Sequence, residues 1–117
     1  MIKEANVTLM VKDIERSVRF YANDLGLKLK ARYGDQFAQL EAPGTIIALH
    51  PASGEERQPK SESMSIGFAV DSLDGAMAEL SSKGIVFSRV TDDAQVRLAF
   101  FKDPDGHPLY LSQSKWG

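Results

Sequence analysis

The sequence predicts an α+β fold made of two βαβββ modules. Two observations carry this prediction: two apolar runs of period two each lead into a helical pattern, and three short strand-like runs follow each helical pattern. The chain has 117 residues, close to the usual size of one domain. We therefore expect one domain over residues 1–117, with modules at about 4–52 and 63–114 and a linker at about 51–63.

Each module begins with a strand in which apolar residues alternate with small or polar ones. In "NVTLMVKD" the apolar set is Val7, Leu9 and Val11, and in "MSIGFAVD" it is Ile66, Phe68 and Val70. Each run ends at an aspartate, Asp13 or Asp71. We expect these side chains to cap the helices that follow, because a carboxylate there accepts the unpaired N–H bonds of the first turn.

Apolar residues at helical spacing then indicate one helix in each module. The first helix is marked by Ile14, Val18, Tyr21 and Leu25, and the second by Leu73, Met77 and Leu80. Gly26 and Gly84 follow the two patterns. Helices commonly end at a glycine in the left-handed conformation, so both helices are expected to end there.

Three strand-like runs come after each glycine. They are "LKLKARY", "QFAQLE" and "TIIALH" in the first half, and "IVFSRV", "VRLAFF" and "PLYL" in the second. Turn signals separate them, among them the Asp103–Gly106 turn. The repeated order of elements indicates an internal duplication. Between the halves, "PASGEERQPKSES" has no apolar period and is typical of an exposed linker.

The strand faces turned away from the helices predict a cavity. On the two first strands these faces carry Asn6, Thr8 and Met10, and Ser65, Gly67 and Ala69, with no charge among them. Counting the later strands by parity adds His50 and Tyr110 to the same faces. The run "VRLAFF" is expected to add Arg97, Ala99 and Phe101. The alternative is a second apolar interface between sheets or subunits.

Composition narrows the classes of function. The chain has 14 basic and 16 acidic residues with no basic stripe, so no nucleic-acid partner is expected. It has no cysteine, which excludes disulfides, thiol nucleophiles and cysteine-bound metals. The first residues carry charge and lack a long apolar run, so we expect no membrane span and a cytoplasmic protein.

Two motifs give the chain a family resemblance. The pattern "V.D...S..FY...LG" occurs over residues 11–26, and "F.DPDG" occurs over residues 101–106. Together, at this distance in a duplicated βαβββ chain, they resemble the glyoxalase/bleomycin-resistance/dioxygenase superfamily, also called vicinal oxygen chelate proteins. The resemblance implies that each sheet curls into a half-barrel and that two half-barrels enclose a cavity. It also implies a homodimer whose cavities take a module from each chain.

The same resemblance implies positions for a divalent metal on the first and last strands of the modules. These positions fall on Asn6, Ala48, Ser65 and Tyr110. None is a good ligand for a transition metal, because alanine has no donor and neutral serine, asparagine and tyrosine are weak ones. We therefore expect no metal and no other cofactor. An atypical site that uses His50 is the alternative, whereas His107 is expected to be a turn residue.

Two functions follow. The first is a metal-independent protein that binds a small, partly aromatic organic molecule, neutral or anionic, with no catalytic residues. Its expected lining residues are Asn6, Thr8, Phe37, His50, Ser65, Arg97, Phe101 and Tyr110, with Trp116 as a further stacking surface. The second is a metal-dependent lyase, isomerase or dioxygenase-like enzyme of the same superfamily. The vacant ligand positions favour the first.

Overall fold

A computed structural model describes residues 1–53 and 64–115. The chain divides into two compact units, Met1–Gln58 and Pro59–Gly117, and each is described by itself. Most of the predicted linker and Trp116 lie outside the described residues.

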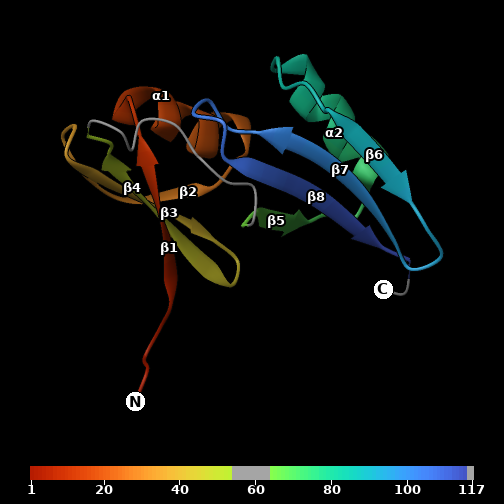
Figure 1. Cartoon of the computed structure of the whole chain (residues 1–117), viewed down its shortest axis with the longest axis horizontal. Helices are drawn as coiled ribbons and strands as arrows, with labels where there is room; N and C mark the ends of the chain where they lie inside the picture. Colours follow the sequence, from red (N-terminus) through yellow and green to blue (C-terminus); the bar gives the residue numbers. More distant parts are fainter. Residues whose placement is uncertain (54–63, 116–117) are drawn as a thin grey trace. The chain divides into compact units, whose positions relative to one another are not determined.

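The first unit is one βαβββ module. Its elements in chain order are β1 (Asn6–Val11), α1 (Ile14–Val18), the π-helix η1 (Arg19–Asp24), β2 (Lys28–Tyr33), β3 (Phe37–Ala42) and β4 (Thr45–Pro51). They form a sheet in the order β1-β4-β3-β2, in which β1 is parallel to β4 and the other pairs are antiparallel (Figure 1).

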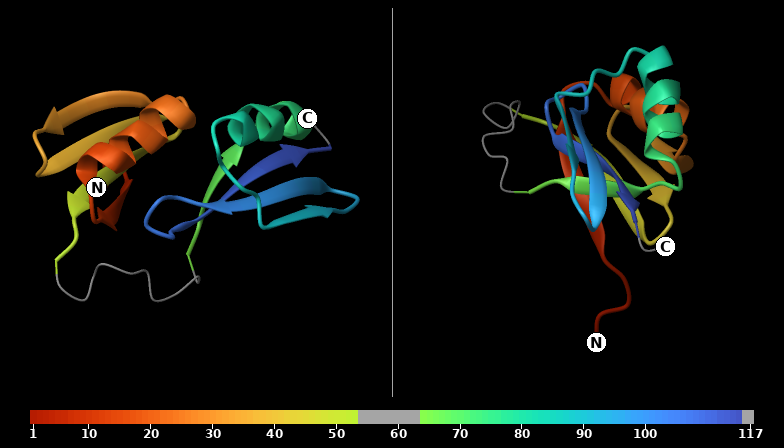
Figure 2. Two further views of the ribbon diagram at one scale, coloured as in Figure 1. Left: turned by 90° about the horizontal axis from the view of Figure 1, so that it is seen from above. Right: turned by 90° about the vertical axis from the view of Figure 1, so that its right-hand side faces the viewer.

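The second unit repeats this topology. It contains β5 (Ile66–Ala69), α2 (Leu73–Ser82), β6 (Arg89–Asp92), β7 (Val96–Lys102) and β8 (Pro108–Ser114), with the sheet order β5-β8-β7-β6. In each unit the helix crosses one face of its own sheet (Figure 2). The predicted α+β fold of two βαβββ modules is therefore confirmed. The strand expected at 85–90 is displaced, since β6 runs from Arg89 to Asp92.

The helix ends follow the expected chemistry with one exception. Asp13 caps α1 by accepting a bond of 3.1 Å from the backbone N–H of Arg16. The prediction that Asp71 caps α2 is wrong. Ser72 immediately precedes the first helical residue and accepts a bond of 3.1 Å from the N–H of Gly75, whereas Asp71 stands one residue too early. Gly26 and Gly84 have positive φ angles of 80° and 92° and end the two helices as expected.

The core of each unit lies between the helix and the sheet. Burial follows the strand period on β1 and β3, whereas Ile47, Ala48 and Leu49 of β4 are all buried. The largest fully buried side chains in the first unit are Val11, Tyr21, Leu40, Ile47 and Leu49, and in the second unit Leu73 and Leu109. The apolar parity predicted for the first and last strands is confirmed.

The face predicted for β7 is wrong. Directly opposed residues of an antiparallel pair point to the same side of the sheet. Phe101 is paired with Leu109, and Arg97 with Gln113, so both lie on the side that α2 covers. Phe101 is only 2% exposed. The residues of β7 that share a face with Tyr110 are Leu98 and Phe100.

Candidate functional site

Each sheet has one face that its own helix does not cover, called here the open face. In the first unit the open face carries Asn6, Thr8, Met10, Phe37, Gln39, Glu41, Ile46, Ala48 and His50. In the second unit it carries Gly67, Ala69, Arg89, Thr91, Leu98, Phe100, Tyr110 and Ser112.

Four residues cross the second open face in a single line, called here the aromatic row. Gly67 of β5 is paired with Tyr110 of β8, Tyr110 with Phe100 of β7, and Phe100 with Arg89 of β6. The ring centroids of Tyr110 and Phe100 are 6.1 Å apart. The Arg89 guanidinium carbon lies 4.3 Å from the centroid of the Phe100 ring, a cation–π contact. The row therefore presents two neighbouring rings, and the Arg89 guanidinium lies over one of them, that of Phe100.

The Tyr110 ring lies directly over Gly67. A Cβ atom built at Gly67 would stand 2.1 Å from Cζ and 2.4 Å from the hydroxyl oxygen of Tyr110, far inside van der Waals contact. Tyr110 is therefore on the open face, as its strand parity predicts. The absence of a side chain at position 67 is what allows the Tyr110 ring to lie this close to β5.

A hollow of about 450 Å³ adjoins the row where β7 and β8 approach their turn. Its lining residues are Ser65, Ser88, Arg89, Phe100, Phe101, Lys102, Pro108 and Leu109. Of the residues predicted for the site, only Ser65 and Phe101 belong to this lining. We call it the β7–β8 hollow.

Arg97 does not lie in the hollow. Its guanidinium donates a bond of 3.0 Å to Asp74 on α2 and stands 3.5 Å from a carboxylate oxygen of Asp92. The bond from Arg97 holds the pKa of Asp74 below its usual value. Arg97, the cation that the sequence predicts for the cavity, is therefore bound to carboxylates on the helix side of the sheet. The basic residues that line the hollow are Arg89 and Lys102.

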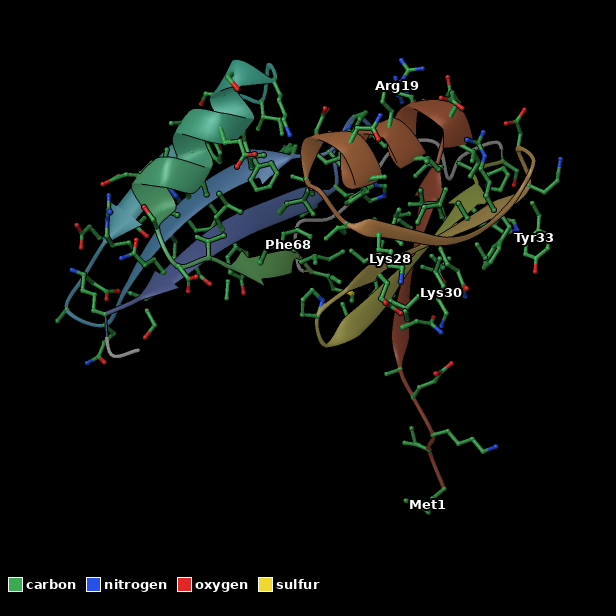
Figure 3. All side chains as sticks on the ribbon, turned by 180° about the vertical axis from the view of Figure 1, so that it is seen from behind. Met1, Arg19, Lys28, Lys30, Tyr33 and Phe68 are labelled. Carbon is green, nitrogen blue, oxygen red and sulfur yellow. The ribbon has the colours of Figure 1, made fainter. Side chains whose placement is uncertain are left out.

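The predicted site residues of the first unit lie on its open face, and none of them lines the β7–β8 hollow. Asn6, Thr8, Phe37 and His50 all have that parity. His50 places Nδ1 3.0 Å from the carbonyl oxygen of Pro51. The Phe37 ring lies 6.1 Å from that of Tyr33, which is 68% exposed at the end of β2 (Figure 3).

A second hollow, of about 740 Å³, lies at another place in the first unit. It is lined by the residues before β1, the end of the helical segment and the β3–β4 turn, namely Glu4, Ala5, Gly26, Leu27, Lys28, Glu41, Ala42, Pro43, Gly44, Thr45 and Ile46. Among the described residues that line it, acidic and basic groups occur together and none is aromatic.

His107 is held in the turn before β8, as expected of a turn residue. Its ring Nδ1 lies 2.7 Å from Oδ2 of Asp103, whose side chain is fully buried. The other carboxylate oxygen of Asp103 accepts backbone bonds from Asp105 and His107. The hydrogen bond to Asp103 raises the pKa of His107 above its ordinary value, against the opposing effect of burial. The contacts of Asp103 with His107 stabilise the turn that precedes β8.

Two negative observations apply to residues 1–53 and 64–115. No three His, Cys, Asp or Glu side chains come together there in a group that could hold a metal. No helix in that part of the chain is long and apolar enough to cross a membrane.

Sequence reasoning missed Phe100 and Arg89, which complete the aromatic row. A signal for Phe100 was present in the Asp103–Gly106 turn. Lys102 and Pro108 are the paired residues next to the turn. Two residues further along each strand, Phe100 is therefore paired with Tyr110. Arg89 carried no comparable signal, because its strand begins later than the apolar pattern suggests.

The chain resembles one known protein family and several individual proteins. The sequence pattern of the Glyoxalase/Bleomycin resistance protein/Dioxygenase superfamily matches residues 5–111. The chain is 28% identical to lactoylglutathione lyase of Schizosaccharomyces pombe, over 92% of this chain and 46% of that protein, so it spans about half the length of that relative. It is 31% identical to the uncharacterized protein YwkD of Bacillus subtilis, over 91% of this chain and 92% of YwkD.

Among solved structures, the chain resembles TnmS3, an antibiotic binding protein from Streptomyces sp. CB03234. The TM-score is 0.79, with 22% identity, over 98% of each chain. At that identity the likeness concerns the fold.

Proposed function

Because the chain belongs to the glyoxalase/bleomycin resistance protein/dioxygenase superfamily, we propose that it is a cytoplasmic, metal-independent protein that binds a small, partly aromatic organic molecule. The aromatic row carries this proposal. Tyr110 and Phe100 place neighbouring rings on the open face, and the aromatic row contains no carboxylate. Such rings suit a planar organic ligand.

The antibiotic-binding activity of TnmS3, a protein of similar fold, supports a binding role. The alternative is a lyase, isomerase or dioxygenase-like enzyme that needs a metal. The relationship to lactoylglutathione lyase favours that alternative. The positions that the family resemblance assigns to metal ligands oppose it, since Asn6, Ala48, Ser65 and Tyr110 offer at most weak donors.

Added metal is expected to leave the stability of the protein unchanged. Zinc, nickel or manganese should not shift the melting temperature in differential scanning fluorimetry, whereas a ligand at a hundred times its Kd should add about 2.7 kcal/mol of stability. As a positive control, the combined change Asn6→His, Ala48→Glu, Ser65→His and Tyr110→Glu should create a metal-dependent shift. A large shift of the unaltered protein with any of these metals would favour the enzyme instead.

We also propose a two-fold homodimer in which the open faces of modules from the two chains enclose the ligand cavity. Tyr110, Phe100 and Leu98 form an apolar patch on one of these faces, and extended apolar patches are usually buried against a partner. Light scattering at micromolar concentration should return twice the mass of the 12.9 kDa chain. A monomer mass under these conditions would contradict the homodimer.

A further inference from the structure

We propose that the β7–β8 hollow is an anion subsite, which binds the carboxylate of an aromatic ligand while the aromatic row holds the ring. This inference rests on the proposed function and narrows it from small organic molecules to anionic aromatic ones. It concerns residues of the second unit alone.

The charged residues that line the hollow are basic, as far as the structure describes them. Within residues 1–53 and 64–115 these are Arg89 and Lys102, and no Asp or Glu of that part of the chain lines the hollow. Ser65 adds a hydroxyl group, whereas the hydroxyl of Ser88 already donates a hydrogen bond of 3.3 Å to the carbonyl oxygen of Phe100. Two basic side chains beside the Ser65 hydroxyl attract an anion and disfavour a cationic ligand.

Arg89 differs from the two other arginines that lie on strands. Arg32 donates bonds to Glu15 at 2.9 Å and Asp35 at 3.2 Å. Arg97 is paired with Asp74 and Asp92.

In residues 1–53 and 64–115, by contrast, Arg89 is paired with no carboxylate, and its one interaction is with the Phe100 ring. A guanidinium that lies over an aromatic ring can still donate its N–H groups to another acceptor. Two of these N–H groups are placed so that they can bind both oxygens of one carboxylate.

The distances fit one ligand that spans both features. Arg89 stands 4.3 Å from the Phe100 centroid, and the Phe100 and Tyr110 centroids are 6.1 Å apart, so cation and rings lie within the span of one bicyclic aromatic acid. The hollow volume of about 450 Å³ is within the usual range for small-ligand sites.

The test compares two probes that differ only in charge, 2-naphthoate and the neutral 2-naphthamide, with affinities from NMR titration of the full chain. We expect naphthoate to bind about tenfold more tightly, the worth of one charge-assisted hydrogen bond. This preference should fall as salt is added, because the subsite is exposed. The largest shifts should be at Arg89, Phe100 and Lys102.

The variant Arg89→Gln should abolish the preference for naphthoate and leave naphthamide binding nearly unchanged. Lys83→Gln, which removes the same charge at the end of α2 away from the hollow, should keep the preference. Equal binding of both probes by the unaltered protein would overturn the anion subsite and leave aromatic binding intact. Binding of neither probe would overturn both proposals. A preference that persists in Arg89→Gln would also overturn the assignment of the subsite.

Discussion

Replacing Phe101 with alanine is expected to lower the free energy of unfolding by about 3–5 kcal/mol, the range for truncation of a buried phenylalanine. The side chain is 2% exposed, and its ring meets that of Phe87 edge-on with centroids 5.3 Å apart. This ring contact would be lost together with the buried apolar area. A loss of this size is a large part of the stability of a small domain, and urea unfolding followed by circular dichroism would measure it.

The neighbouring Phe100→Ala variant is the matched control. Phe100 is partly exposed on the open face, where its removal breaks the cation–π contact with Arg89 and the ring contact with Tyr110. We expect a loss of about 1 kcal/mol in stability, together with weaker binding of aromatic ligands. If Phe100→Ala proved the more destabilising of the two, the register of β7 on β8 would be wrong.

Replacing Asp103 with alanine is expected to cost about 3 kcal/mol, because it removes a buried acceptor and leaves the His107 ring and two backbone N–H groups without their partner. The carboxylate is fully buried and accepts bonds from the backbone N–H groups of Asp105 and His107 as well as from the His107 ring. Asp103→Asn, which keeps an acceptor at the same place, should lose less. Equal stability of Asp103→Ala and the unaltered protein in urea would contradict this role.

The same pair predicts a pH dependence. The Asp103 carboxylate raises the pKa of His107 above its ordinary value of 6.5. The folded state therefore binds the proton more tightly than the unfolded state, and the resulting stabilisation is complete below pH 6.5 and is lost as the pH rises through the folded-state pKa. The stability difference between the protein and a His107→Gln variant should shrink between pH 6 and pH 9 in urea titrations. A difference that grows with pH would have the wrong sign.

The sequence was sufficient to predict the fold because the signals in each module agree with one another. Period-two strands, a capped helix and a glycine at the helix end recur in the same order, and Asp13, Gly26 and Gly84 have the predicted roles. The cap of α2 was assigned to the wrong neighbour because Asp71 and Ser72 are both good capping residues. Only the position of the first helical residue distinguishes them.

The candidate site was harder to predict because β7 is apolar on both faces. In "VRLAFF" the alternate positions Leu98 and Phe100, and Ala99 and Phe101, are equally hydrophobic, so periodicity does not choose between them. The choice is made by pairing across the hairpin, which joins Phe101 to Leu109. Tyr110 was placed on the correct face because its neighbours Leu109 and Leu111 are both clearly apolar.

The Tyr110 ring over Gly67 has a consequence for how this chain can change over evolutionary time. Positions 67 and 110 do not vary independently, because even a methyl group at 67 would occupy space that the tyrosine ring holds. A lineage that gains a side chain at 67 must first, or at once, lose or displace the aromatic residue at 110. In an alignment of true relatives, a large ring at position 110 should therefore occur only together with glycine at position 67, whereas glycine at 67 can also stand opposite a smaller residue.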